Sequence, residues 1–350
     1  MSPVLWSQHV RKAAYGACAF SLLVFGLTVS SPRSALAGSV SSPTVVAKAI
    51  VDAFDRLFGG PHPSFRSVHA KGILLEGRFV PDPHAAQLSR AIHLQGASVP
   101  IVVRFSDFAG VPTIADNAPE ANPKGMAVKF MLSDGGSTDI VAHSYNGFPA
   151  ATPEEFLAFL TALGSGPEQF ATHVASHPAA RLFVDAPKPA PLSFASESYF
   201  GVNAFNFKNA EGVSHFGKYY FAPLAGEAHL TDAQAAAEKP DYLFSEVQAR
   251  LRNGPIRFAL RVQLAEAGDS LTDGSFPWPR SRRFVQLGIL ELTAVGANQK
   301  QRQRDILFTP LSLVGGIAPS DDPMLISRTR AYRVSHRRRS GDQAAHLASQ

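Results

Sequence analysis

The sequence predicts an α+β protein built on an antiparallel β-sheet that can close into a barrel. The chain has 350 residues, of which 45% are apolar and 17% charged, a composition typical of a soluble globular protein with a sizeable core. Runs of β-branched and aromatic residues, separated by turns, fall into two groups along the chain. Helical patterns follow or split each group, with no internal repeat. These features together indicate one α+β domain.

Residues 1–37 have the pattern of a secretory signal. Arg11 and Lys12 precede an apolar run over residues 13–29, and Ala35-Leu36-Ala37 is a small-x-small cleavage site. The run reaches the lower limit of about 17 residues for a spanning helix, so cleavage and retention as a membrane anchor both stay open. We expect export to the periplasm, with contact to the membrane only through this segment. The single cysteine lies inside it, so no disulfide is expected in the mature chain.

The net charge of +5 is concentrated in the N-terminal segment and near the C-terminus. Residues 1–37 hold three cations and no acid, which leaves 30 cations against 28 acids in the remainder. So small a balance gives no argument for a nucleic-acid partner. The arginine-rich stretch SRTRAYRVSHRRR (327–339) therefore needs a separate explanation.

The elements expected in the first half follow from their periodicity. Apolar residues at helical spacing predict a helix over 44–60. A helix with a capping box of Thr152 and Glu155 is expected from 152, and a further helix over 167–184 is broken near Pro178. Strands are expected within residues 69–79, 99–108 and 125–132.

The second half repeats this organisation. A helix over 239–254 ends at Asn253-Gly254. Two late helices are expected over 304–316 and 326–338. Strands are expected within residues 196–224, 256–266 and 283–293.

Four residues of the C-terminal stretch share one face if it is helical. Relative to Arg328, Tyr332 lies at about 40°, His336 at about 80° and Arg339 at about 20°, because each residue advances about 100°. A solvated basic helix would explain the charge run. Alternatively, the guanidinium beside Tyr332 favours an ionised phenol, and a phenolate is a ligand for the iron of haem.

Two further positions suggest a buried site. On a strand, Val102, Arg104 and Ser106 face the same way. A guanidinium there needs an anion, either a carboxylate elsewhere in the chain or a phosphate or haem propionate. His69 falls within an expected strand, where it is either structural or, beside a haem, an acid and base toward a peroxide.

Four segments occur in the order found in haem catalases: RSVHAKG (66–72), VRFSD (103–107), PKGMAVKF (123–130) and RTRAY (328–332). The chain resembles that superfamily over residues 40–340, and more closely its short branch, the catalase-related peroxidases. The resemblance implies one domain over residues 38–345. Its fold would be an eight-stranded antiparallel β-barrel wrapped by helices, with haem b between barrel and helices.

The resemblance also implies roles for individual residues. His69 matches the distal histidine, and Ser106 the serine that hydrogen-bonds it. Tyr332 matches the proximal iron ligand, and Arg328 the arginine that keeps this tyrosine ionised. The chain must bend between Arg66 and His69 for both to reach one haem. The cofactor is further expected to contact Arg66, Arg104 and Arg339 through its propionates, and to lie near His336 on the helical face that carries Arg328.

The stretch DIVAHSYNGFP (139–149) departs from the family pattern. Catalases place an asparagine in the distal pocket after a D-[LI]-V stretch. Simple register gives Ser144 at that position, and Asn146, two residues later, is the candidate for the distal amide. Phe148 is the candidate for the aromatic ring over the haem.

These departures favour a peroxidase over an efficient catalase. A weaker distal amide affects the second, dismutating step more than the first, and a shorter chain leaves the haem open to bulky substrates. We expect reduction of organic hydroperoxides and of hydrogen peroxide with a small external electron donor. The missing N-terminal arm favours a monomer or a weak homodimer.

Three alternatives stay open. A small true catalase would dismutate hydrogen peroxide without a donor. A fatty-acid hydroperoxide rearranging enzyme would share the fold and need no reductant. A periplasmic haem carrier or lipid-binding barrel, which is not an enzyme, would not depend on His69.

Overall fold

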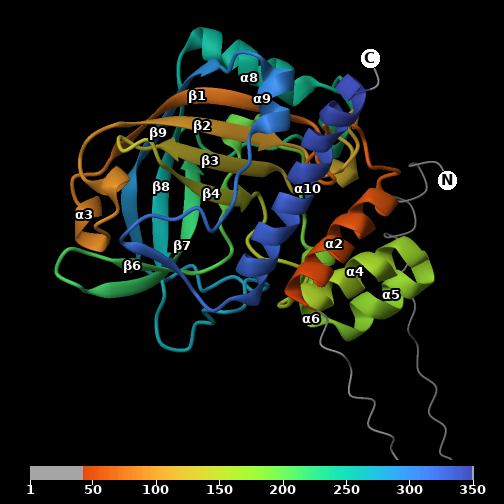
Figure 1. Cartoon of the computed structure of the whole chain (residues 1–350), viewed down its shortest axis with the longest axis horizontal. Coiled ribbons are helices and arrows are strands. Elements are labelled where there is room, and N and C mark those ends of the chain that lie inside the picture. The colour runs from red at the N-terminus through yellow and green to blue at the C-terminus, as the bar shows by residue number, and fades with distance from the viewer. Residues whose placement is uncertain (1–41, 349–350) are drawn as a thin grey trace, which may run out of the picture.

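The computed structural model describes residues 42–348, and an antiparallel β-barrel forms its centre (Figure 1). The ring of pairings runs β7, β8, β9, β1, β2, β3, β4 and β5, and closes where β5 pairs with β7. Two short strands, β6 and β10, extend one side of the barrel. This confirms the expected eight-stranded barrel. The strands are β1 (Gly72–Pro81), β2 (Val99–Ser106), β3 (Gly125–Met131), β4 (Ser137–His143), β5 (Tyr199–Phe200), β6 (Phe205–Lys208), β7 (Ser214–Pro223), β8 (Ile256–Leu264), β9 (Phe284–Val295) and β10 (Ile317–Pro319).

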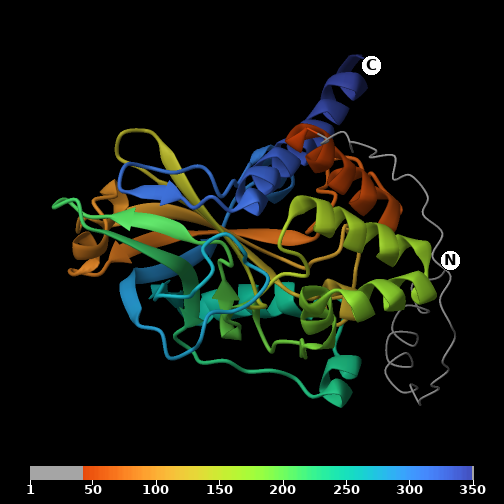
Figure 2. The same ribbon diagram turned by 90° about the horizontal axis from the view of Figure 1, so that it is seen from below.

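The helices gather mainly at one end of the barrel, as Figures 1 and 2 show. Helices α2, α4, α5 and α6 form one layer there, and the long α10 passes in front of the sheet and packs against α2. The helices are α2 (Pro43–Leu57), α3 (Ala85–Leu88), α4 (Pro153–Ser165), α5 (Pro167–Ser176), α6 (Pro178–Asp185), α7 (Asp232–Ala237), α8 (Tyr242–Asn253), α9 (Gln299–Asp305) and α10 (Pro323–Ala348), with 3-10 turns at Ile92–Leu94, Pro119–Ala121 and Phe194–Ser196.

Alternation along the strands fills the barrel and fixes which residues face outward. Phe105 and Met126 stand opposite each other on β2 and β3, and both are buried in the main core. Their neighbours Ser106 and Gly125 also stand opposite each other, and successive residues of a strand point to opposite faces. Ser106 and Gly125 therefore lie on the outer face, which is the face toward α10.

The expectation of a helix over 304–316 is wrong. Helix α9 ends at Asp305, and the following segment runs irregularly to β10. Pro310 lacks an amide hydrogen and moves the residue before it away from helical geometry. Leu311 and Leu313 instead pack against the barrel core. The apolar periodicity that suggested a helix thus reflects contacts with the barrel.

Two other expectations change in detail. His69 does not lie on a strand, because β1 begins at Gly72 and the chain bends before it. The capping box at α4 is only half formed: the Thr152 hydroxyl accepts from the amide of Glu155 at 3.2 Å, whereas the Glu155 carboxylate accepts from Ala151 rather than Thr152. Strand β4, which was not expected, carries part of the site.

Between residues 42 and 348, no helix combines the length and apolar character that crossing a membrane requires. The expected signal or anchor over residues 1–37 lies outside the described residues.

Candidate functional site

His69 lies at a bend that only a few residue types adopt readily. Its φ of 58° is in the left-handed region, which costs a non-glycine residue about 1–3 kcal/mol unless its surroundings hold it there. The amide of His69 donates to the carbonyl of Phe108 at 2.6 Å, and Arg104 donates to the carbonyl of His69 at 2.9 Å. The bend brings the ring toward the outer face of β2 and β3.

The ring of His69 is oriented through its Nδ1 atom. Nδ1 lies 3.0 Å from the carbonyl oxygen of Asp107 and 3.1 Å from the Ser106 hydroxyl. A carbonyl only accepts, so the hydrogen is on Nδ1 and Nε2 keeps its lone pair. No hydrogen bond within residues 42–348 engages this Nε2. The predicted contact between Ser106 and His69 is therefore present, and the ring offers a free base.

Gly125 provides the space for this ring. A Cβ atom at Gly125 would lie 2.8 Å from Nδ1 of His69, 2.9 Å from its Cε1 and 2.6 Å from the Ser106 hydroxyl oxygen. Any side chain at this position would displace the ring. The glycine of the PKGMAVKF segment is therefore required by the approach of His69 to the sheet.

Burial and positive charge keep His69 neutral. Burial, followed by the charge of Arg104, lowers the pKa of His69 to about 3, although the Asp107 carbonyl acts in the opposite direction. At neutral pH the ring is thus a neutral imidazole.

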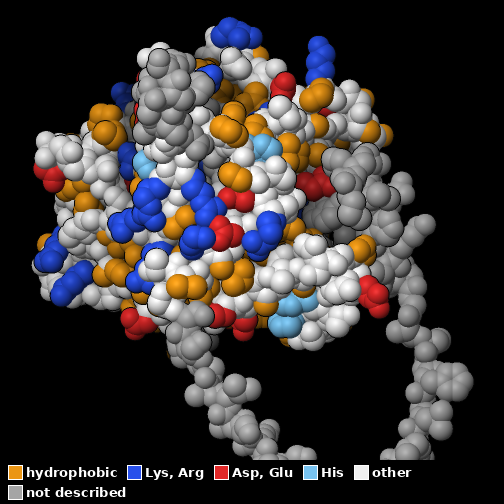
Figure 3. All heavy atoms as spheres, turned by 45° about the vertical axis from the view of Figure 1, so that its right-hand side comes forward, with side chains coloured by type: hydrophobic (Ala, Val, Ile, Leu, Met, Phe, Trp, Pro, Cys, Tyr) orange, Lys and Arg blue, Asp and Glu red, His pale blue; other side chains and the backbone are white. Residues whose placement is uncertain are grey.

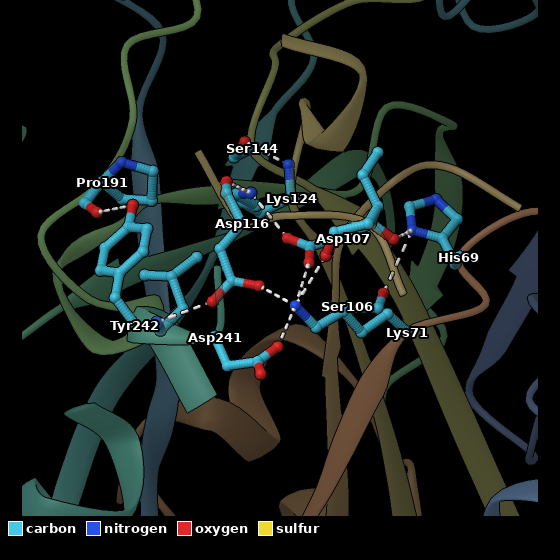
Figure 4. A network of polar contacts seen from close by, with 12 residues as sticks. His69, Lys71, Ser106, Asp107, Asp116, Lys124, Ser144, Pro191, Asp241 and Tyr242 are labelled. Atoms are coloured by element: carbon cyan, nitrogen blue, oxygen red, sulfur yellow. Dashed lines mark hydrogen bonds and ion pairs between the residues drawn. The ribbon is translucent and has the colours of Figure 1, made fainter. Parts of the chain in front are cut away.

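A buried ion network anchors the segment that holds His69 (Figure 4). The Asp107 carboxylate pairs with the fully buried Lys124 at 2.6 Å, and Lys71 pairs with Asp116 at 2.5 Å. Lys71 also reaches the exposed Asp241 at 2.7 Å, so the network extends to the surface. Burial and the nearby charge of Asp107 raise the pKa of Asp116 to about 7. Because Asp107 is fixed through its carboxylate, its carbonyl is held in place for Nδ1 of His69.

Tyr332 and Arg328 form a contact on α10. The Tyr332 hydroxyl oxygen accepts from Nε and Nη2 of Arg328, each at 3.1 Å. Arg328 is held in turn by the side-chain oxygen of Asn203, whose amide donates to Asp322 at 2.7 Å. Two guanidinium donors on one oxygen stabilise negative charge there. The contact expected from helical spacing is therefore present.

Three further guanidinium groups meet at the end of α9. Arg66 and Arg339 both donate to the carbonyl of Ile306, at 3.1 and 2.8 Å, and Arg104 donates to the side-chain oxygen of Gln303 at 3.1 Å. The last carbonyls of a helix lack partners within it, and Arg66 and Arg339 supply donors for them. His336 belongs to the same arrangement, since its Nε2 lies 2.8 Å from the carbonyl oxygen of Asp305.

Within the described residues, none of these three arginines forms an ion pair with a carboxylate. Burial and then the charges of Arg104 and Arg339 lower the pKa of Arg66, and burial and then Arg339 lower that of Arg104 to about 9. Burial lowers the pKa of Arg339 to about 10. The charge of Asp107 acts on the pKa of Arg104 and that of Asp305 on the pKa of Arg339 in the opposite direction, without a direct ion pair in either case. Because neutral oxygens accept the hydrogen bonds of all three groups, the cluster is suited to bind an anion.

The remaining arginines of α10 point away from this cluster. Arg333 and Arg337 are exposed, and Arg338 forms ion pairs with Asp52 and Asp55 of α2. Basic side chains with a few acidic ones among them gather on the face seen in Figure 3. The helix thus has one solvated basic face and one face turned to the site.

The predicted residues after β4 are placed less clearly. Ser144 accepts from the backbone amide of Lys124 at 2.9 Å, and Asn146 makes no hydrogen bond within residues 42–348. Phe148 packs on Phe156, with ring centroids 4.7 Å apart, and lies 6.3 Å from the ring of His143. The role of Asn146 stays a prediction.

Sequence reasoning missed His143, Gln303 and Asn203. Gln303 joins Arg104 to the carbonyl of Gly72, and Asn203 positions Arg328. His143 is the last residue of β4, and its Nε2 is buried without a partner. The β-branched residues before His143 could have predicted strand β4, which ends at His143. No sequence pattern pointed to Gln303 or Asn203, because both lie outside the four family motifs.

Comparison with known proteins identifies the family of the chain. A sequence model of the catalase family matches residues 58–349. A catalase-related peroxidase of Mycolicibacterium paratuberculosis is 39% identical over 290 residues, covering 81% of this chain and 91% of the relative. A catalase-related peroxidase of Synechococcus elongatus is 29% identical, covering 93% of this chain and 96% of the relative.

Solved structures share the fold. A fungal catalase superposes with a TM-score of 0.72 at 21% identity, and catalase A from Saccharomyces cerevisiae with 0.70 at 22%. Both alignments cover 81% of this chain but only 61% and 62% of those chains, so this chain spans about three fifths of their length. Matched by the family's sequence model over most of its length and 39% identical to a catalase-related peroxidase, the chain belongs to the catalase family.

Proposed function

We propose that the protein is a haem-dependent peroxidase that reduces organic hydroperoxides and hydrogen peroxide with electrons from an external donor. The observation that carries this proposal is the pairing of two features around one face of the barrel. One is the neutral His69 with a free Nε2, and the other is the Tyr332 oxygen held by two guanidinium donors. The similarity to two catalase-related peroxidases along almost their whole length supports it.

The residues present fit haem b. Arg104 and Arg339 are buried and Arg66 is half-buried, and none of the three forms an ion pair with a carboxylate in the described part of the chain, which suits two propionates. The Tyr332 oxygen is the donor that would hold the iron, and Arg328 would keep it anionic. When bound, haem supplies the redox chemistry that breaks the O–O bond and draws electrons from the donor.

His69 would move the proton during this reaction. Its Nε2 accepts the proton of the hydroperoxide and returns it to the oxygen that leaves as ROH. The overall reaction is ROOH + 2 donor-H → ROH + H₂O + oxidised donor. Ser106 and Asp107 hold the ring through Nδ1, so that Nε2 keeps its direction while its protonation changes.

The distal side favours the peroxidase over a true catalase. Among the described residues, no hydrogen bond fixes the Asn146 amide beside His69, and Ser144 is engaged with the backbone of Lys124. A rearranging enzyme stays an alternative because it would use the same residues. A haem carrier explains less, since it has no need for a strained, neutral and oriented histidine.

The assay that tests the proposal follows hydrogen peroxide and cumene hydroperoxide in turn, with the haem-loaded protein, with and without an electron donor. We expect loss of cumene hydroperoxide that depends on the donor. Rapid oxygen release from hydrogen peroxide without a donor would establish a small catalase instead. Consumption of fatty-acid hydroperoxides without a donor would identify the rearranging enzyme.

Replacing Tyr332 by phenylalanine should abolish stable haem binding or change the ferric optical spectrum. The variant removes the oxygen that the Arg328 guanidinium holds and leaves the ring in place. Tyr220→Phe is the matched control, because among the described residues the Tyr220 hydroxyl bonds only Ser198, and Tyr220 belongs to β7 rather than α10. Haem content and an unchanged spectrum in Tyr332→Phe would contradict the assignment of the iron ligand.

Replacing His69 by asparagine should lower kcat/KM for hydroperoxide by about 10²–10⁴-fold with haem retained, because the acid and base is lost. Asparagine tolerates the left-handed backbone at this bend better than most residues, so the fold should persist. His215→Asn, on an exposed part of β7, is the control. Activity within threefold of the unmodified protein would exclude His69 as the base.

Protonation of His69 should cause no change in kcat/KM over roughly pH 5–8. The working form is the neutral base, which is present above its folded pKa of about 3. The acid limb of kcat/KM against pH should therefore lie well below the ordinary histidine value of about 6.5. A limb near pH 6.5 that disappears in His69→Asn would show that the site does not keep this ring neutral.

A further inference from the structure

His143 lies beside His69 on the outer face of the barrel. It is paired with Gly125 in the register of β3 and β4, and Gly125 is paired with Ser106 in the register of β2 and β3. Directly opposed residues point to the same side, with Cβ atoms about 4.5–5.5 Å apart. The ring of His69 sits over Gly125, the glycine that lies between Ser106 and His143. His143 is thus the next side chain along this row.

His143 and His69 carry the hydrogen of the neutral ring on different nitrogens. Its Nδ1 accepts a hydrogen bond from the amide of Tyr145 at 3.4 Å. The hydrogen of the neutral ring is therefore on Nε2. This Nε2 is buried and has no partner within residues 42–348. A buried N–H without an acceptor is costly, and native proteins rarely leave one unless something binds there.

Charges on both sides of the site act on His143. Burial comes first, followed by the charges of Arg328 and His69 and then Lys188, and together they lower its pKa to about 3. His143 therefore lies within electrostatic reach of both the Tyr332–Arg328 pair and the distal base. Its side chain is a neutral donor on the same outer face of the barrel as Gly125 and Ser106.

We propose that His143 binds the hydroperoxide, donating a hydrogen bond from Nε2 to one peroxide oxygen while His69 accepts the O–H of the other. An O–OH group carries one donor and acceptor lone pairs, and the two rings offer one acceptor and one donor. The group recognised is the hydroperoxide function itself, shared by organic hydroperoxides and hydrogen peroxide. This inference rests on the proposed function, and it assigns to His143 the place where an asparagine was expected.

His93 serves as a control for the alternative that His143 has only a structural role. His93 is also buried with one ring nitrogen, Nδ1, unpartnered, and it packs against Phe79 and Phe130. Phe79 is near the end of β1, whereas His69 precedes its start, so His93 lies at the other end of the barrel. A ring that matters only for packing should behave like His93 when it is replaced.

Cyanide binding to the ferric haem tests the proposal without turnover. The bound ligand is an anion that accepts a hydrogen bond, so it reports on a donor in the pocket. His143→Phe keeps a ring but removes the donor, and His143→Gln keeps a donor. Titration of the haem absorbance should give a Kd about tenfold higher for His143→Phe, and within about threefold of the unmodified protein for His143→Gln. His93→Phe should leave the Kd unchanged.

The outcomes separate this inference from the proposed function. Unmodified protein that holds no haem overturns both. Haem binding with a cyanide Kd that is the same in His143→Phe and His93→Phe overturns only the role of His143. If phenylalanine excludes the haem, His143→Ala takes its place in the same comparison, and a Kd equal to that of the unmodified protein again overturns the proposal.

Discussion

Three guanidinium groups, two of them buried and one half-buried, are the constraint around which the site is arranged, and none forms an ion pair with a carboxylate in the described chain. Arg66, Arg104 and Arg339 come from the bend before β1, from β2 and from α10, so their convergence joins three distant parts of the sequence. Carbonyls at the end of α9 accept from Arg66 and Arg339, and the Gln303 side chain and the carbonyls of His69 and Ala70 accept from Arg104. None of these acceptors carries a net negative charge, so the cluster is suited to bind an anion.

Together with burial, the same cations keep His69 neutral. Arg104 holds the carbonyl of His69 and also contributes to the low pKa of its ring. One residue thus supports the left-handed backbone and the neutral imidazole together. The Lys124–Asp107 pair serves the other side of the ring, since it fixes the carbonyl that accepts from Nδ1. Contacts on both sides of His69 therefore hold its left-handed backbone in place: Arg104 bonds its carbonyl, and the Lys124–Asp107 pair fixes the carbonyl that accepts from its ring.

How far the sequence predicts this site depends on how local each feature is. The face shared by Arg328, Tyr332 and Arg339 follows from helical spacing, and α10 is regular enough for the spacing to hold. The bend at His69 was inferred only from the need of Arg66 and His69 to reach one cofactor, because the contacts that impose it come from Arg104 and Phe108. The irregular segment after α9 could not be predicted, since its apolar residues pack on a barrel formed by distant strands. His143 was missed because its position beside Gly125 follows from the register of β4, a strand that the sequence analysis did not predict.

Backbone groups give the two histidines opposite hydrogen-bonding roles. A carbonyl at Asp107 places the hydrogen of His69 on Nδ1, and an amide at Tyr145 places the hydrogen of His143 on Nε2. The free Nε2 of the first ring is then an acceptor, and that of the second a donor. Two identical side chains on one face of the barrel can in this way match the two ends of an O–OH group. Neither assignment depends on pH near neutrality, because burial and the surrounding cations keep both rings uncharged.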